Sequence, residues 1–160
     1  MQPTQVEVLG RAWLTGQLLR VGIDLARPDR DTGVDLIAYP ADLAWFCPMQ
    51  LKVVTGDGIT VWRKYVGLPL AVVYVFLGTT DGGLGRRRDT QTFVMSPEQA
   101  CDLPRRCRRH FAPEHLTYRF DPIHSALHEL LELYTVADEQ WHERLPGMAR
   151  RPEAAEQPRD

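Results

Sequence analysis

Three polar side chains stand within two short apolar segments of the sequence. Asp35 lies in residues 34–39, and Gln50 and Lys52 lie in residues 48–54. Side chains two residues apart on a β-strand project from the same face, so Gln50 and Lys52 are expected to point the same way. Neighbouring strands lie roughly 5 Å apart, which would bring Asp35 opposite this pair. We therefore expect a carboxylate, an amide oxygen and an ammonium to converge on one spot.

These groups suit metal-assisted chemistry on a phosphate. Mg²⁺ prefers oxygen ligands and usually binds through one or two carboxylates, several waters and a substrate phosphate. Asp35 would supply the carboxylate, and the side-chain oxygen of Gln50 and the backbone carbonyl of Leu51 would complete the protein ligands. The ion would polarise the phosphate and lower the pKa of its bound water. Lys52 would position or deprotonate that water, or stabilise the charge that develops on the phosphate.

The alternative interpretation is structural, with Asp35 facing solvent from an edge strand. Two observations favour a functional site. Both segments are largely apolar around their polar residues, and an unpaired buried polar group costs roughly 1–3 kcal/mol, a charge more. Lysine also occurs only at Lys52 and Lys64, in a chain that otherwise uses arginine. Lysine can release a proton in catalysis, whereas arginine cannot usefully do so.

The composition is that of one globular domain. The chain has 160 residues, a hydrophobic fraction of 44% and a formal net charge of −2, so we expect a real core and no general affinity for polyanions. We expect a domain over residues 1–145 and a disordered polar tail over residues 146–160. No apolar run approaches ~18 residues, and the N-terminal residues do not resemble a signal peptide. We therefore expect no contact with a membrane.

Contacts with nucleic acid would have to come from local clusters of basic residues. Two arginine clusters are candidates for phosphate contacts, with ordinary solvation of their side chains as the alternative. They comprise Arg86, Arg87, Arg88, Arg105, Arg106, Arg108 and Arg109.

The first half of the chain has the pattern of a helix followed by an antiparallel meander. Hydrophobic periodicity predicts a helix over residues 3–21, with Thr4 as N-cap and Glu7 completing a capping box. The unbroken apolar run at residues 70–77 predicts a central strand that is covered on both faces. Residues 61–66 are predicted to form a short helix or its approach. The three strands of the meander are predicted at residues 23–27, 34–39 and 48–54.

The second half predicts one more strand and two helices. The strand covers residues 91–95, and the helix after it begins with Ser96 as N-cap and Pro97 at its first position. We expect this helix to run to about Phe111, with Pro104 as a candidate break. A further helix is predicted over residues 122–143. Together the elements predict an α/β fold, a three-layer α/β/α sandwich with a mixed central sheet.

The combination of Asp35 with Gln50-Leu51-Lys52 resembles the motif of the PD-(D/E)XK nuclease superfamily, which has the restriction-endonuclease-like fold. The Gln-x-Lys form is similar to that of the methyl-directed, Mrr-like type IV restriction enzymes, and the strand order resembles that of the archaeal Holliday-junction resolvases. The resemblance covers roughly the first two-thirds of the chain. It implies a core of helix, three strands, helix and strand, followed by C-terminal helices.

The resemblance also implies a function. We expect a metal-dependent endonuclease that hydrolyses DNA with Mg²⁺ or Mn²⁺, as a homodimer, in a bacterial restriction, defence, repair or mobile-element setting. The superfamily often carries an acid on its first helix, but none stands near residues 11–13, where we would expect it. Glu7 is therefore a capping residue first, with metal binding as its alternative role. Gln50 in place of Glu removes one negative charge, which weakens metal binding unless Glu7 or Asp31 comes close.

Two other functions stay open. The first is a non-catalytic binding or structural module that keeps the nuclease fold, which Gln50 and the missing first-helix acid favour. Mg²⁺ affinity at Asp35 separates this module from an enzyme. The second is cleavage of RNA by the same site.

Several other residues have patterns that could suggest chemistry but are expected to be structural. His124 and His128 lie four residues apart and could ligate zinc, but no His-Glu-x-x-His arrangement is present, so we expect a polar helix face. Residues 82–85 are rich in glycine but lack the Gly-Lys-Ser/Thr of a P-loop. The three cysteines form no Cys-x-x-Cys pair, which predicts reduced thiols in a cytoplasm, with Cys101 and Cys107 in the core.

Overall fold

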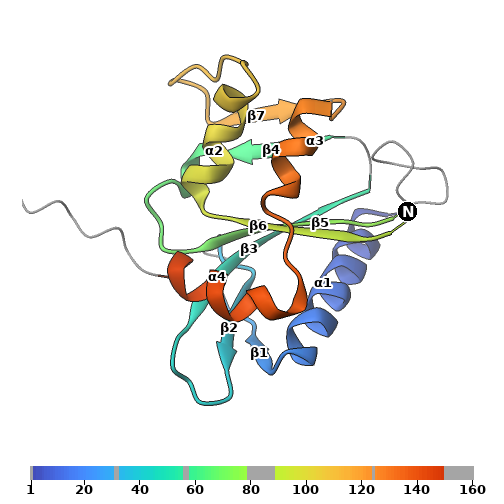
Figure 1. Ribbon diagram of the computed structural model, residues 1–160, viewed down its shortest axis with the longest axis vertical. Helices are drawn as coiled ribbons and strands as arrows, with labels where there is room; N and C mark the ends of the chain where they lie inside the picture. The colour runs from blue at the N-terminus through green and yellow to red at the C-terminus, as the bar shows by residue number, and fades with distance from the viewer. Residues whose placement is uncertain (1, 31–32, 56–57, 79–88, 124, 150–160) are drawn as a thin grey trace, which may run out of the picture.

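A five-stranded mixed sheet forms the centre of the computed structural model (Figure 1), which describes residues 2–30, 33–55, 58–78, 89–123 and 125–149. The strand order is β1-β2-β3-β5-β6. β1, β2 and β3 form an antiparallel meander, β5 runs parallel to β3, and β6 runs antiparallel to β5. The mixed sheet expected from the sequence is confirmed. The strands span Ile23–Ala26, Leu36–Pro40, Cys47–Val54, Ala71–Phe76 and Gln91–Met95.

Helices cover both faces of this sheet (Figure 1). One hydrophobic core lies between the sheet and the helices on each face. Helices α1 (Pro3–Arg20) and α4 (Trp141–Met148) cover one face. Helices α2 (Pro97–Arg106) and α3 (Ser125–Glu132) cover the other, together with a small two-stranded sheet. The predicted layered α/β arrangement is therefore confirmed, and every residue of β5 is buried between the layers, as expected for a central strand.

Strand β3 divides its side chains between the two cores. Met49 and Leu51 belong to the core under α1 and α4. Side chains alternate along a strand, so Gln50 and Lys52 project from the opposite face, which we call the motif face. A Cβ atom at Gly10 of α1 would overlap the side chain of Val53, so glycine at this position lets α1 lie close to β3.

The start of α1 differs from the prediction. Pro3 stands at the first helical position, and Gln2 is the N-cap. The side chain of Gln5 accepts a hydrogen bond from the backbone N–H of Gln2 at 3.2 Å. The predicted capping box of Thr4 and Glu7 is therefore wrong, because proline at the first position places the cap two residues earlier than expected.

Residues 61–66, predicted to be a short helix or its approach, are the end of a strand followed by a turn of 3₁₀ helix. β4 (Ile59–Trp62) pairs with β7 (Thr117–Phe120) in the two-stranded sheet, and the 3₁₀ turn η1 spans Arg63–Tyr65. Ile59 and Val61 are buried, which is the period-two pattern of a strand. The pairing partner lies far along the chain, so no local pattern could reveal it.

The single helix predicted over residues 122–143 is also wrong, because the chain breaks between α3 and α4. The backbone N–H of Val94 donates to the carbonyl of Tyr134 at 2.9 Å, and Thr135 forms a bridge with Phe93. The β-branched residues Thr135 and Val136 favour such extended backbone over helix. A 3₁₀ turn, η2 (Asp138–Gln140), then leads into α4.

Two helix ends also differ from their predicted positions. α2 ends at Arg106, and Arg108 after it has a positive φ of 55°, so this helix stops short of Phe111, while Pro104 lies within it. α4 continues to Met148, which contacts the core below the sheet. The first residues of the predicted tail thus belong to the folded unit, and residues 150–160 lie outside the described residues.

None of the described helices is both long and apolar enough to cross a membrane.

Candidate active site

Asp35 and Gln50 lie together, as the strand register predicts. Asp35 immediately precedes β2, and its backbone N–H donates to the carbonyl of Met49 at 2.8 Å. This bond continues the pairing of Leu36 with Met49. The Oδ2 atom of Asp35 accepts hydrogen bonds from the backbone N–H of Leu51, at 2.8 Å, and from the side-chain amide of Gln50. The carboxylate is therefore fixed against β3 at the centre of the motif.

Gln50 is a buried polar residue, and both the nitrogen and the oxygen of its side-chain amide are hydrogen-bonded. Its side chain is 5% exposed. Its Nε2 atom donates to Asp35 and, at 3.3 Å, to the carbonyl of Leu51. Its Oε1 atom accepts from the hydroxyl of Tyr65 at 2.8 Å, and Tyr65 is itself 4% exposed. Burial without these bonds would be costly, so the network holds the amide in one position.

Lys52 lies beside this network and contacts the same tyrosine. Its side chain is half-buried, and its Nζ atom is 5.9 Å from the ring centroid of Tyr65 and 5.5 Å from that of Trp62. Both distances fall within the range of cation–π attraction. Tyr65 thus touches Gln50 with its hydroxyl and faces Lys52 with its ring. Asp35 and Gln50 are joined directly by a hydrogen bond, and Tyr65 contacts both Gln50 and Lys52.

Trp62, Lys64 and Tyr65 were not identified as site residues from the sequence. The Nζ atom of Lys64 is 5.2 Å from the Trp62 ring centroid and 4.8 Å from the Tyr65 ring centroid. The one available signal was that lysine occurs at two positions only. Both lysines lie over the same two rings.

An open cavity adjoins Lys52 on the motif face. Its volume is about 470 Å³. The hydroxyl of Tyr74 donates to the carbonyl of Thr60 at 2.9 Å. Burial raises the pKa of Tyr74, so this lining residue stays uncharged. The lining comprises Lys52, Val53, Val54, Thr55, Gly58, Thr60, Trp62, Tyr74, Arg119 and Asp121.

The donor atoms around Asp35 fit a hard divalent cation. Within the described residues, no three His, Cys, Asp or Glu side chains lie close enough to form a metal site by themselves. The motif instead offers the carboxylate of Asp35, the carbonyl of Leu51 and the amide of Gln50, which are the ligand types that Mg²⁺ prefers. For Oε1 of Gln50 to join the other two oxygens, its amide must turn over. The hydroxyl of Tyr65 tolerates either orientation, because it can donate to Oε1 or accept from Nε2.

The other predicted metal ligands lie elsewhere or outside the described residues. Glu7 is exposed on α1, which packs against the face opposite the motif face. Asp31 and His124 are not among the described residues. His128 lies on α3, where its Nδ1 atom is 3.6 Å from Oε1 of Glu132, as the structural interpretation of this helix face expects. A role for Glu7 in metal binding stays a prediction.

The cysteine thiols are protonated structural groups. Cys47 is fully buried, and burial raises the pKa of its thiol to about 12. Burial likewise raises the pKa values of Cys101 and Cys107, which are half-buried against the core of the motif face. The three cysteines are free, as predicted.

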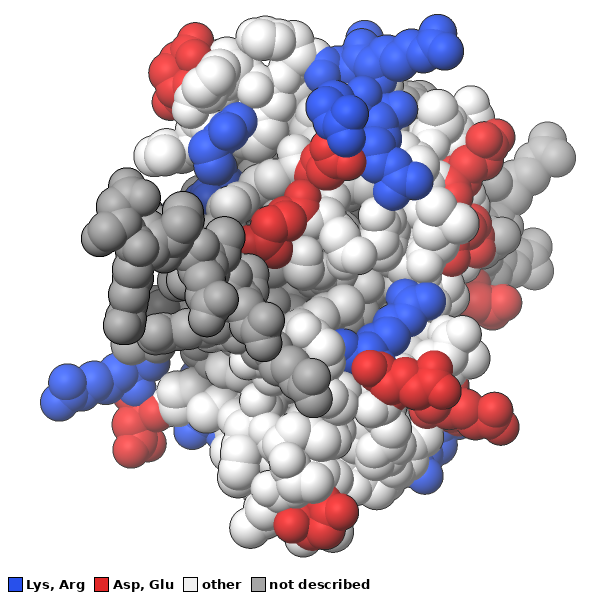
Figure 2. Space-filling model, turned by 60° about the vertical axis from the view of Figure 1, so that its left-hand side comes forward, with Lys and Arg blue, Asp and Glu red and all other residues white. Residues whose placement is uncertain are grey.

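The second arginine cluster lies at the end of α2, on the same side of the sheet as the motif. Arg105 is paired with Asp102 at 2.6 Å, and Arg106 donates to the hydroxyl of Tyr134 at 2.7 Å, while Arg108 and Arg109 are exposed. Figure 2 shows basic side chains gathered near the top, at the height of α2, β4 and β7 in Figure 1, with acidic side chains beside them. The first cluster, at residues 86–88, lies outside the described residues.

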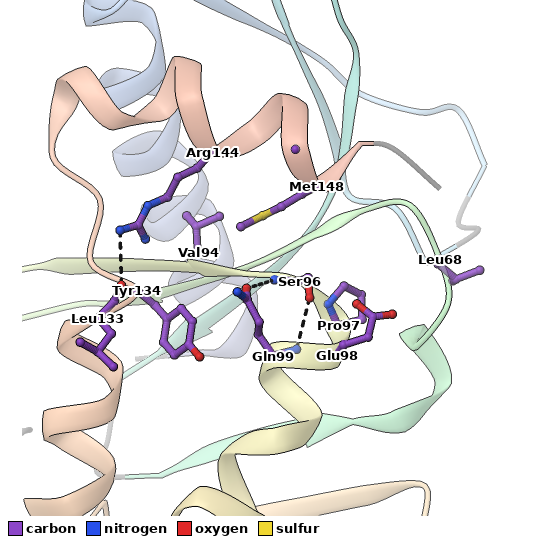
Figure 3. A pocket seen from close by; sticks show the side chains of 11 residues that line it. Leu68, Val94, Ser96, Pro97, Glu98, Gln99, Leu133, Tyr134, Arg144 and Met148 are labelled. Carbon is purple, nitrogen blue, oxygen red and sulfur yellow. Dashed lines mark hydrogen bonds between the residues drawn. The ribbon is translucent and has the colours of Figure 1, made fainter. Parts of the chain in front are cut away.

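A larger cavity lies away from the motif (Figure 3). Its volume is about 700 Å³, and α2, α4 and residues 133–134 line it. Its polar groups are already bonded: Arg144 donates to the carbonyl of Leu133 at 3.3 Å, and Glu98 accepts from the N–H of Gly67 at 2.8 Å. Partial burial alone would raise the pKa of Glu98, but hydrogen bonds, chiefly that from Gly67, lower it. We therefore assign no site here.

Comparisons with known proteins give a distant likeness to a solved structure. No protein-family model matches the chain, and no curated protein matches it. Among solved structures, the chain is similar to Hjc, a Holliday junction resolvase from the archaeal hyperthermophile Archaeoglobus fulgidus. The TM-score is 0.46 at 9% sequence identity, over 81% of this chain and 88% of that one. A likeness this weak carries no argument, so the fold and the site rest on the structure itself.

Proposed function

We propose that this protein is a metal-dependent nuclease that hydrolyses phosphodiester bonds of DNA at the site formed by Asp35, Gln50 and Lys52. The observation that carries the proposal is the hydrogen-bonded cluster of the Asp35 carboxylate, the Gln50 amide and the backbone of Leu51. Lys52 stands one strand repeat beyond Gln50 on the same face. An open cavity beside Lys52 gives a substrate access to it.

Each residue would have a separate role. Asp35 and the carbonyl of Leu51 would hold the ion, with the oxygen of Gln50 as a third protein ligand after its amide turns over. When bound, Mg²⁺ or Mn²⁺ would polarise the phosphate and lower the pKa of its water. The ammonium of Lys52 would orient the attacking water and stabilise the negative charge that builds up on the phosphate oxygens in the transition state.

The arginines at the end of α2 would contribute to binding the DNA. Phosphate contacts position a duplex without reading its sequence. Arg108 and Arg109 are exposed, and among the described residues no carboxylate pairs with them, whereas Asp102 pairs with Arg105. Arg86, Arg87 and Arg88 stay in the proposal as a second phosphate-binding segment. A homodimer and a bacterial, cytoplasmic setting also belong to it.

One observation favours a different class of function. The amide of Gln50 already bonds to Oδ2 of Asp35 and to the hydroxyl of Tyr65, so the nitrogen and the oxygen of this amide both have partners without a cation. A non-catalytic module that keeps the fold for binding would need no more than this network. Metal binding separates the two functions, because such a module has no use for a cation at Asp35.

The test combines metal binding with a cleavage panel. Binding of Mn²⁺ to the intact chain and to Asp35→Asn would be measured by calorimetry, followed by Mg²⁺- and Mn²⁺-dependent cleavage of single-stranded, duplex, branched and methylated DNA and of RNA. We expect the parent to bind the metal and cut DNA, and Asp35→Asn to do neither. Equal metal binding by both proteins, or cleavage of RNA alone, would overturn the proposal as stated.

A further inference from the structure

The two lysines of the chain converge on the same pair of aromatic rings. The Nζ atom of Lys52 approaches the centroids of Trp62 and Tyr65 to 5.5 and 5.9 Å, and that of Lys64 approaches them to 5.2 and 4.8 Å. Lys52 comes from β3 and Lys64 from η1. The fold therefore places both ammonium groups near the same two aromatic rings at the edge of the motif.

The backbone that carries Lys64 is fixed on both sides. Before it, Arg63 donates to the carbonyls of His115, Phe111 and Ala112 at 3.1 to 3.2 Å. Arg63 also stacks its guanidinium 4.1 Å from the Phe111 ring centroid. After it, the hydroxyl of Tyr65 is bonded to Gln50. The position of Lys64 relative to the motif is thus set by two anchored neighbours.

The ammonium of Lys64 is available to an anion. Its side chain is exposed, and within the described part of the chain no carboxylate pairs with it. Two neighbouring cations repel each other, and the negative faces of Trp62 and Tyr65 offset that repulsion only in part. An anion beside both ammonium groups would relieve it. The chemistry of the proposed substrate supplies such anions at regular intervals along its backbone.

We infer that Lys64 binds the backbone phosphate adjacent to the one that is cleaved, while Lys52 acts at the cleaved phosphate. This inference rests on the proposed nuclease function and adds a binding residue to it. Lys52 shares β3 with Gln50 and lines the open cavity, so it is the lysine nearer the reacting atoms. Lys64 has no contact with Asp35 or Gln50 among the described interactions. It is a binding residue that holds the substrate strand beside the reacting phosphate.

The experiment measures DNA affinity in the absence of divalent cations, where no cleavage occurs. Fluorescently labelled duplex and branched DNA would be titrated with the intact chain, Lys64→Gln and Lys64→Arg over a series of NaCl concentrations. Losing one phosphate contact should reduce the slope of log affinity against log salt by about 0.9. We expect that loss for Lys64→Gln and the parent slope for Lys64→Arg.

Arg20→Gln is the matched control, because it removes one exposed positive charge at the end of α1. If Lys64→Gln changes the slope no more than Arg20→Gln does, the inference is wrong. A parent that cuts DNA normally while Lys64→Gln binds unchanged refutes the role of Lys64 alone. A parent that neither binds DNA nor cuts it would instead refute the proposed function.

Discussion

The hydroxyl of Tyr65 donates a hydrogen bond to Oε1 of Gln50 at 2.8 Å, with both side chains buried. This bond joins η1, the 3₁₀ turn after β4, to the middle of β3. β4 and β3 belong to different sheets. It also fixes the oxygen of the Gln50 amide, whose nitrogen is bonded to Asp35. The position of the motif glutamine side chain therefore depends on a residue outside the motif.

Tyr65→Phe should lower the free energy of unfolding by about 1–3 kcal/mol, because it leaves the buried Oε1 of Gln50 without a donor. Urea unfolding monitored by circular dichroism measures this change. Tyr118→Phe is the control: Tyr118 lies in β7 at intermediate exposure and makes ring contacts, so its loss of a hydroxyl should change the free energy by less than about 0.5 kcal/mol. Equal effects of the two substitutions would show that the Gln50 bond contributes nothing specific.

Gln50→Glu should tighten metal binding by about tenfold or more, because it places a second carboxylate beside Asp35. Without metal, the two carboxylates repel each other, and this raises the pKa of one of them. A raised pKa in the folded state stabilises the protein below the ordinary carboxyl range, and that stability is lost as the pH rises. We therefore expect the metal-free variant to become less stable than the parent between acidic and neutral pH.

Calorimetry with Mn²⁺ and thermal unfolding over a pH series check both parts of this expectation. The double variant Asp35→Asn with Gln50→Glu is the control, since it has a single carboxylate again. It should bind metal no better than the parent. A Gln50→Glu protein with unchanged metal affinity would mean that this side chain does not face the cation.

Much of the sheet could be predicted because its signals are local. The alternation of Met49, Gln50, Leu51 and Lys52 fixes which side chains share a face, and a meander of short strands brings Asp35 opposite them. The apolar run that became β5 predicts burial on both faces. The part of the site that depends on neighbouring strands was therefore accessible from sequence alone.

The aromatic part of the site was not accessible in this way. Trp62 and Tyr65 reach the motif because β4 pairs with β7, whose residues follow more than fifty positions later. The break after α3 likewise depends on Thr135 pairing with Phe93 of β6. Such pairings arise from tertiary contacts, and a periodicity measured within one segment does not contain them. The same limit explains why residues 61–66 and 122–143 were predicted to be helical.

The exposed arginines after α2 should make DNA binding salt-sensitive. We expect Arg108→Asn with Arg109→Ser to reduce the salt slope by about two, at roughly one contact per arginine. Asparagine suits the positive φ of Arg108. Arg105→Ser should have a smaller effect, because Asp102 already partners that guanidinium at 2.6 Å. Fluorescence anisotropy over a salt series measures the slopes, and an unchanged slope for the double variant would place the DNA on another surface.

Cys47 should be inert towards thiol reagents in the folded protein. Burial raises the pKa of its thiol to about 12 from an ordinary value of 9.0, so only a trace of reactive thiolate exists at neutral pH. Iodoacetamide labelling followed by mass spectrometry should modify Cys101 and Cys107 first and reach Cys47 only after unfolding. The raised pKa also predicts that stability is full below about pH 9 and falls as the pH rises towards 12. Cys47→Ala should remove that part of the alkaline loss, and early labelling of Cys47 would contradict the burial.

Lys52→Ala should slow cleavage by about 10²–10⁴-fold while leaving the fold and DNA affinity largely unchanged. In the proposed mechanism Lys52 stabilises charge that appears only in the transition state, so its loss affects turnover and spares ground-state binding. The cation–π contacts with Trp62 and Tyr65 contribute on the order of 1 kcal/mol to stability at a half-exposed site. The melting temperature should therefore fall only slightly.

Lys52→Arg separates charge from proton transfer in the same position. Arginine keeps the positive charge but does not give up a proton near neutral pH, so a variant that recovers most of the rate would assign Lys52 an electrostatic role. A variant as slow as Lys52→Ala would favour proton transfer or the compact geometry of the ammonium. Cleavage rate, DNA affinity and melting temperature would be measured together for both variants. A Lys52→Ala protein that unfolds, or one that cuts as fast as the parent, would make Lys52 a structural residue and remove the central group of the proposed site.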